Sequence, residues 1–180
     1  MSENILDKII KKKIEKVDLK KKSTSLKLLI EKIDENKSFI NFKAKIQNNI
    51  KDKKISIIAE IKKASPSAGI IMKQYNPIEI AEIYYKNNTT CLSILTEEDF
   101  FLGNLIHVSK VKEKINLPIL CKDFFIDKFQ VPLARSYGAD AILIILAGVS
   151  DDLAFELYEE ALKFNMSIIV EVHTVEEAKR

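Results

Sequence analysis

Short runs of apolar residues alternate with longer amphipathic segments along the chain from Ile55 onward. Continuous apolar runs are typical of strands that are buried on both faces of a sheet. Helical segments between such strands favour a parallel sheet, because each helix carries the chain back to the edge where the next strand begins. We therefore expect an α/β fold with five strands, at residues 55–61, 91–95, 117–122, 140–146 and 167–172.

The segments between these runs carry the local signals of helices. Asn76 is a suitable N-cap residue, and Pro77 follows at the first helical position, where an N–H group has no partner within the helix. Each segment ends near Gly or Asn, which often terminate helices. The expected helices lie within residues 76–88, 104–115, 127–138 and 150–165.

The first 54 residues have a different pattern, in which isoleucines recur at near-helical spacing among lysines. Helices are expected at residues 3–20, 26–33 and 38–46. The Ser-Thr-Ser stretch at 23–25 offers a cap for the second of them. The sequence thus predicts two parts, a helical extension over residues 1–54 and a β/α part over residues 55–180.

Two architectures share the β/α alternation, an open doubly wound sheet and a (β/α)8 barrel. A dinucleotide-binding sheet is disfavoured, because no glycine-rich phosphate loop follows the first apolar run. Charged residues stand instead at the carboxyl ends of alternate runs, namely Glu60, Lys62, Lys122 and Glu171. In a barrel, inward-pointing side chains at these ends converge on one site. The pattern therefore favours a barrel with two amines and two carboxylates in a common pocket.

Composition places the chain among globular proteins. It has 180 residues, of which 47% are hydrophobic and 31% charged, as expected for a single domain with an extension. No apolar run approaches the roughly 18 residues of a membrane span, and the N-terminus lacks the apolar core of a signal peptide. We therefore expect a cytoplasmic protein without a membrane partner. Cys91 and Cys121 lie far apart within apolar runs, so we expect buried free thiols.

Positive charge is concentrated in the extension. Residues 1–54 hold 16 of the 29 Lys and Arg residues but only 8 of the 26 acidic residues. A basic arm could attract nucleic acid or an anionic small molecule. The acidic residues interspersed among the lysines, and the scarcity of aromatic residues, favour a solvated helix surface over a nucleic-acid interface. We therefore expect no nucleic-acid partner.

Other polar residues are assigned to structure. Lys63 and Asp123 have the opposite parity to the charged strand-end residues, so both are expected to point away from the pocket, with Asp123 as a hydrogen-bonding loop or cap residue. His107 and His173 are the only histidines, and a third ligand at a recognisable metal-site spacing is missing. His173 is therefore expected to be a loop residue, and no metal site is predicted.

Four stretches resemble those of indole-3-glycerol-phosphate synthase, a tryptophan-pathway enzyme: IAEIKKASPSAG, LSILTEEDFFLGN, LPILCKDFFIDKFQVPLARSYGADAILII and VEVH. The resemblance runs from the helical extension to the last residue. It implies a (β/α)8 barrel that converts 1-(2-carboxyphenylamino)-1-deoxyribulose 5-phosphate, an anionic substrate, into indole-3-glycerol phosphate, CO2 and water. The family uses neither a metal ion nor an organic cofactor, so none is expected here.

The resemblance also implies roles for individual residues. Lys122, in the KDF stretch, corresponds to the family's general acid, and Glu171 corresponds to its base. Glu60 corresponds to a further catalytic glutamate, and Lys62 corresponds to a lysine that contacts the substrate phosphate. One residue near the anthranilate carboxylate and three that line the pocket of the aromatic ring complete the set: Ser65, Phe101, Phe124 and Leu143.

Five strands are fewer than the eight of a closed barrel. We therefore expect the N-terminal portion of the family's barrel, and little synthase activity from residues 1–180 alone. The alternative is a non-catalytic partial barrel that is inactive without further strands. Another phosphate-handling barrel, such as an isomerase of the same pathway, is less favoured, because it would not need the amine, carboxylate and serine of EIKKASPS.

Overall fold

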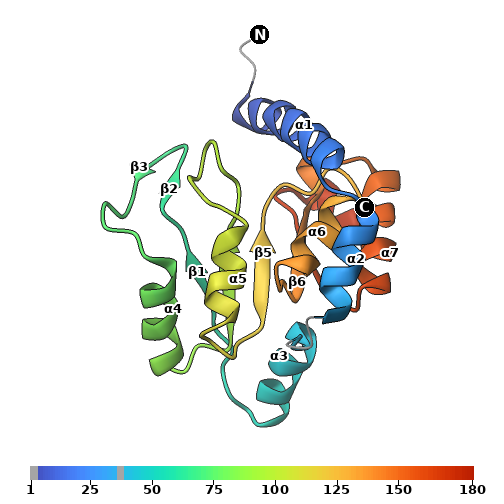
Figure 1. Ribbon diagram of the computed structural model, residues 1–180. Helices are drawn as coiled ribbons and strands as arrows, with labels where there is room; N and C mark the ends of the chain where they lie inside the picture. The colour runs from blue at the N-terminus through green and yellow to red at the C-terminus, as the bar shows by residue number, and fades with distance from the viewer. Residues whose placement is uncertain (1–3, 36–38) are drawn as a thin grey trace.

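A single five-stranded parallel sheet forms the centre of the molecule (Figure 1). The computed structural model describes residues 4–35 and 39–180. The order in the sheet follows the order along the chain: β1 (Ile58–Ile61), β4 (Cys91–Leu95), β5 (Ile119–Lys122), β6 (Ala141–Ile145) and β7 (Ser167–Glu171). A doubly wound sheet reverses its strand order, whereas the strands of a barrel run in sequence. The chain therefore has the α/β arrangement of consecutive strands in a (β/α)8 barrel, and the doubly wound alternative is wrong.

Each strand is followed by a helix, as the sequence predicts. The helices are α4 (Pro77–Lys86), α5 (Ile106–Lys112), α6 (Gln130–Ser136), α7 (Asp151–Lys163) and the short α8 (Val175–Lys179), with a 3-10 turn, η1 (Leu146–Gly148), after β6. The predicted cap of α4 is confirmed, because Asn76 Oδ1 accepts a hydrogen bond from the N–H of Ile78 at 3.1 Å. Local capping chemistry thus fixes this helix start independently of packing.

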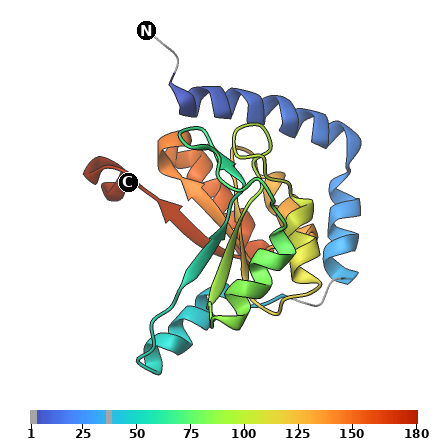
Figure 2. The ribbon, with the colours of Figure 1, turned by 90° about the vertical axis from the view of Figure 1, so that its left-hand side faces the viewer.

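The extension wraps around the sheet rather than standing apart from it (Figure 2). Helix α1 (Ile5–Ser23) crosses over the carboxyl ends of the strands, α2 (Leu26–Glu35) packs beside α6, and α3 (Phe42–Lys51) lies at the opposite end of the sheet (Figure 1). The prediction of a third helix at 38–46 has the wrong limits. Asn41 caps the helix through a 2.8 Å hydrogen bond from the N–H of Ala44, so helical structure begins at Phe42. Ser38 lies outside the described residues.

The first strand is shorter than predicted, and a small hairpin follows it. Residues 55–57 precede the paired segment, and Ile55 is 88% exposed. In the described part of the chain β1 has β4 as its one strand neighbour, and pairing begins where Ile58 aligns with Cys91. After β1, the chain forms a hairpin of two-residue strands, β2 (Ala64–Ser65) and β3 (Gly69–Ile70).

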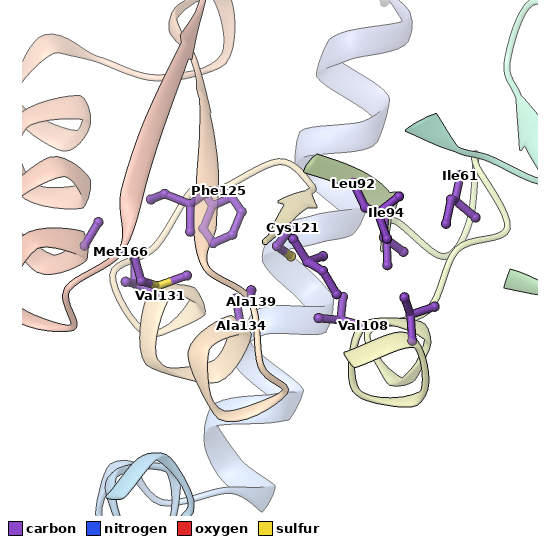
Figure 3. Close-up of a cluster of buried hydrophobic side chains, with 14 of the residues drawn as sticks. Ile61, Leu92, Ile94, Val108, Cys121, Phe125, Val131, Ala134, Ala139 and Met166 are labelled. Atoms are coloured by element: carbon purple, nitrogen blue, oxygen red, sulfur yellow. The ribbon is translucent and has the colours of Figure 1, made fainter. Parts of the chain in front are cut away.

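Alternate residues of each strand face two different cores. One face packs against the helices through a large apolar cluster that includes Ile94, Cys121 and Val131 (Figure 3). The other face forms a smaller cluster in which Leu120 and Leu143 meet other strand residues and Phe42 of α3. Residues two positions further along a strand share its face. The strand-end residue Lys122 therefore belongs to the face of Leu120.

A buried charged group joins the extension to the sheet. Asp140, just before β6, accepts hydrogen bonds from the N–H of Ile40 at 2.7 Å, from that of Ile119 at 2.9 Å and from Lys112 Nζ at 2.5 Å. Burial raises the pKa of Asp140 and lowers that of Lys112, while their mutual attraction opposes both shifts. Asp140 thus ties the segment before α3 to β5 and α5.

Two further predictions from composition can be compared with the structure. Cys91 and Cys121 are both free and buried, as predicted. Within residues 4–35 and 39–180, the structure contains no helix that is long and apolar enough to cross a membrane.

Candidate active site

A cavity of about 660 Å³ opens at the carboxyl ends of the strands, beneath α1. Helix α1 contributes the apolar side chains of Ile5, Leu6 and Ile9 to its lining. The cavity brings together all eight residues that the sequence singles out: Glu60, Lys62, Ser65, Phe101, Lys122, Phe124, Leu143 and Glu171. Segments that are 111 positions apart in the chain therefore contribute to one concave surface, as parallel strands allow.

The first pair of charges joins β5 to β7. Lys122 Nζ lies 2.6 Å from Glu171 Oε2, across the end of β6. Lys122 is the last residue of β5 and Glu171 is the last residue of β7. The side chains are 24% and 31% exposed, so each is reachable from the cavity while most of its surface is shielded from water. A proton donor and a proton acceptor thus stand within one hydrogen bond of each other.

The second pair comes from the end of β1 alone. Lys62 Nζ lies 2.5 Å from Glu60 Oε1, and both side chains are about one-third exposed. Helix α4 holds the backbone of Glu60 in place, because the hydroxyl of Tyr84 donates a 3.1 Å hydrogen bond to the carbonyl of Glu60. Each lysine of the cavity is therefore neutralised by a glutamate, and an anionic ligand group could take the place of either carboxylate.

Aromatic and aliphatic side chains form one wall of the cavity. The rings of Phe101 and Phe124 lie 6.2 Å apart between centroids, with 41° between their planes. Leu143, on β6, is 3% exposed and continues this wall. Such a surface suits a flat apolar group, whereas the lysines suit anionic groups. The cavity can thus hold a ligand that has both.

Ser65 belongs to the hairpin after β1. Its hydroxyl accepts a 3.2 Å hydrogen bond from the N–H of Ala68 and lies 3.5 Å from the Ser67 hydroxyl. Pro66 and Ser67, at the hairpin tip, also line the cavity. The serine therefore stabilises the turn and presents its oxygen at the cavity rim.

Asp123 contributes to the lining of the same cavity. Its carboxylate nevertheless lies on the helix-facing side, as its parity predicts, because the Thr96 hydroxyl that it binds also lies 3.3 Å from Cys121 Sγ. Its carboxylate lies 2.6 Å from Lys13 Nζ of α1 and accepts a 2.6 Å hydrogen bond from the Thr96 hydroxyl. Asp123 is indeed a hydrogen-bonding loop residue, but one that holds α1 over the site.

His173 is a loop residue, as predicted, yet it also lines the cavity. Its Nε2 lies 3.2 Å from Glu171 Oε1. The signal in the sequence was the spacing of two residues, which gives His173 the parity of Glu171. Proximity to the glutamate could not be read from that spacing, because the strand ends at Glu171.

The other histidine lies outside the cavity. His107, on α5, packs against Tyr75 with 5.5 Å between ring centroids. Burial lowers the pKa of His107, and the charges of Lys110 and Lys63 lower it further. Among residues 4–35 and 39–180, no three His, Cys, Asp or Glu side chains gather as metal ligands would.

Comparison with known proteins places this geometry in a family. The family model described as indole-3-glycerol phosphate synthase matches residues 6–180. The chain is 46% identical over its whole length to the tryptophan biosynthesis protein TrpCF of Buchnera aphidicola subsp. Schizaphis graminum. It is 41% identical to the indole-3-glycerol phosphate synthase of Aliarcobacter butzleri over 96% of the chain, and 43% identical to that of Prochlorococcus marinus MIT 9515 over 99%.

These relatives are longer than the chain. The matched region spans 38% of the Buchnera protein, 66% of the Aliarcobacter protein and 60% of the Prochlorococcus protein. The similarity nevertheless covers the extension, all five strands and every residue of the two lysine–glutamate pairs.

Proposed function

Because this chain belongs to the indole-3-glycerol phosphate synthase family, we propose that its cavity is the active site of that reaction. The substrate is 1-(2-carboxyphenylamino)-1-deoxyribulose 5-phosphate, and the products are indole-3-glycerol phosphate, CO2 and water. The observation that carries the proposal is the pair of lysine–glutamate contacts at 2.6 and 2.5 Å beside an aromatic wall. The reaction belongs to tryptophan biosynthesis and makes the enzyme a carboxy-lyase.

Lys122 and Glu171 carry the proton transfers in this proposal. The ring carbon that bears the carboxylate attacks the substrate carbonyl, and Lys122 donates a proton to the carbonyl oxygen. Loss of CO2 then restores the electron pair to the ring. Glu171 then removes a proton from the carbon beside the nitrogen, and Lys122, reprotonated from solvent, protonates the hydroxyl that leaves as water. Their 2.6 Å contact lets the two groups exchange the proton that the cycle requires.

The remaining side chains bind and orient the substrate. Lys62 binds the phosphate, and Glu60 stabilises positive charge that develops on the ring-closed intermediate. Ser65 lies near the substrate carboxylate, at the rim of the cavity. The aromatic ring rests against Phe101 and its neighbours in the apolar wall. We place the reaction in the cytoplasm, a location supported by two free buried thiols.

The test is turnover of this substrate by the full-length protein as its gene encodes it, followed through the fluorescence of the indole product. Lys122→Ala and Glu171→Gln should each lower kcat by roughly 100-fold or more, the usual scale for acid–base groups. Lys128→Ala is the matched control, because Lys128 forms only an exposed pair with Glu156 at 3.4 Å. The proposal fails if the protein does not turn the substrate over, or if both site variants keep the rate of the control.

One observation favours the non-catalytic alternative for a polypeptide that consists of residues 1–180 alone. In the described part of the chain, β1 and β7 each have a strand neighbour on one side only. A polypeptide of these residues would then be a non-catalytic partial barrel. Its assay beside the full-length protein separates the two readings, and turnover within tenfold of the full-length rate would exclude the partial-barrel reading.

A further inference from the structure

A buried carboxylate lies directly behind the aromatic wall of the cavity. Glu97 stands two residues after the end of β4 and is 1% exposed. It accepts three hydrogen bonds from consecutive backbone N–H groups: Asp99 at 3.0 Å, Phe100 at 2.7 Å and Phe101 at 3.0 Å. Within the described residues no Lys, Arg or His forms an ion pair with it. Its charge is therefore satisfied by the loop that carries Phe101.

The same loop is closed tightly at its far end. The N–H of Gly103 donates a 2.7 Å hydrogen bond to the carbonyl of Glu97. A Cβ at position 103 would lie only 2.4 Å from the carbonyl oxygen of Leu95, so no larger residue fits there without moving the backbone. Residues 97–103 thus form a short closed loop, and the carboxylate of Glu97 lies inside it, bonded to its N–H groups.

Phe101 projects from this loop into the cavity and meets Phe124 of the next strand's loop. Strand pairing does not fix the position of Phe101, because the preceding strand, β4, ends at Leu95. Its backbone N–H, by contrast, is bonded to the Glu97 carboxylate. The position of this part of the wall therefore depends on an acidic residue that does not line the cavity.

We infer that Glu97 is a positioning residue, whose carboxylate holds Phe101 where the aromatic ring of the substrate rests. The inference rests on the proposed function, since that function supplies the aromatic ring. Removing the carboxylate leaves three partly buried N–H groups without their acceptor, so the loop must rearrange to satisfy them. Phe101 then loses its fixed place, while the lysine–glutamate pairs on β1, β5 and β7 keep theirs.

A double-mutant cycle tests this directly in the full-length protein. Glu97→Ala and Phe101→Ala should each raise KM roughly tenfold, with a smaller change in kcat, because both weaken binding of the ring. The double variant should be no worse than the poorer single variant, since Glu97 acts through Phe101. Multiplicative effects of the two substitutions would overturn the inference. If Glu97→Ala does not fold, Glu97→Gln, which keeps one acceptor oxygen, takes its place in the cycle.

Two controls separate positioning from a general loss of structure. Glu98→Gln should leave KM unchanged, because Lys16 keeps its 3.0 Å contact with Asp99 when the neighbouring pair is lost. Affinity for glycerol phosphate, which has no ring, should be unchanged in Glu97→Ala, and a loss of more than threefold would contradict the inference.

A third measurement does not depend on turnover. Amide hydrogen exchange at residues 99–101 should accelerate at least tenfold in Glu97→Ala but not in Glu98→Gln. Absence of turnover in the wild-type protein would refute the proposed function, whereas unchanged exchange would refute the role of Glu97 whatever the reaction.

Discussion

At the scale of a residue, two adjacent lysines show that the direction of the backbone determines which side chain reaches the cavity. Lys62 lines the cavity and pairs with Glu60, whereas Lys63 lies outside the cavity lining and belongs to the loop that leads into β2. Both are half-buried and carry the same charge. Only the first can contact the phosphate of a ligand held in the cavity.

We therefore predict that Lys62→Ala raises KM at least tenfold in the full-length protein, because one charge-assisted contact with phosphate is lost. Lys63→Ala should leave KM within about twofold of the wild-type value. Steady-state kinetics of the two variants, measured side by side, provides the check. Equal effects of the two substitutions would show that net charge, rather than a specific contact, governs binding.

His107 gives a prediction about pH. Its pKa is lowered from the ordinary value of 6.5 by burial and by Lys110 and Lys63. Between that lowered pKa and 6.5 the unfolded chain binds a proton that the folded chain does not, so stability falls as pH falls through this window. Above pH 6.5 the contribution is fully present. The phenol of Tyr75, which packs against the His107 ring at a tilt, stays neutral because burial raises its pKa to about 12.

Urea denaturation at pH 7.5 and pH 5.0 checks this expectation. His107→Gln should lose less stability between the two pH values than the wild-type protein does. The same loss in both proteins would assign the pH dependence to other groups.

Residue parity accounts for what the sequence could and could not reveal about the site. Glu60, Lys122 and Glu171 lie within strands, where alternation fixes the face. Asp123 and Glu97 lie beyond the ends of β5 and β4, in the loops that follow these strands. Their contacts depend on how each loop folds back, which no periodicity records.

At the scale of an element, lysines hold α1 over the cavity. Lys13 pairs with Asp123, and Lys21 pairs with Asp127, both in the loop after β5. Lys16 lies 2.6 Å from Glu98 in the loop after β4. The positive charge of the extension, expected from its composition to be a solvated surface, is thus partly used to attach α1 to acidic loops.

The Lys13 pair is the buried one, with side-chain exposures of 7% and 12%. Lys13→Ala should therefore lower the free energy of unfolding by about 3 kcal/mol, because it leaves the Asp123 carboxylate without its cation. Lys12→Ala, which removes an exposed pair with Glu15, should change it by less than about 0.5 kcal/mol. Chemical denaturation of the two variants measures both values. A loss below 1 kcal/mol for Lys13→Ala would show that α1 is held by its apolar face instead.

Elements with strong local signals were predicted well, and elements without them were not. The cap at Asn76 defined α4, and the continuous apolar run at 91–95 matches β4 residue for residue. The hairpin strands β2 and β3 have two residues each, too few for any periodicity to appear. Helix α3 begins later than predicted because the side chain of Asn41 caps the helix, which leaves Ile40 outside it.

At the scale of the whole molecule, the parallel alternation of strands and helices could be predicted, but the course of the extension could not. Helical periodicity identified α1 and α2 without indicating where they dock. The course of the extension depends on contacts such as that of Lys13 with Asp123 and that of Ile40 with Asp140, the second pair separated by 100 positions in the chain. Such pairings have no local signature.

The open sheet leads to a prediction for a polypeptide of residues 1–180 alone. Its edge strands carry partly exposed apolar residues, with Ile58 40% and Val170 50% exposed. Unpaired edges of this kind favour association between chains. We expect concentration-dependent self-association, measurable by analytical ultracentrifugation, and less of it in Val170→Lys. A monodisperse monomer at all concentrations would contradict this expectation.

The order of strands in the sheet also determines when each contact can form on the ribosome. Within the five-stranded sheet, each strand after β1 pairs with the strand of that sheet made before it, so the sheet can grow as the chain emerges. The extension is the exception, because its partners are made much later; the N–H of Lys43 in α3, for example, donates a 3.1 Å hydrogen bond to the hydroxyl of Ser167, 124 residues later. At about 5–20 residues per second, synthesis leaves α3 without this partner for roughly 6–25 seconds. Phe42, finally 1% exposed, is covered only as its strand partners such as Cys91, Leu120 and Ala141 are made, and until then it offers an apolar surface to a chaperone.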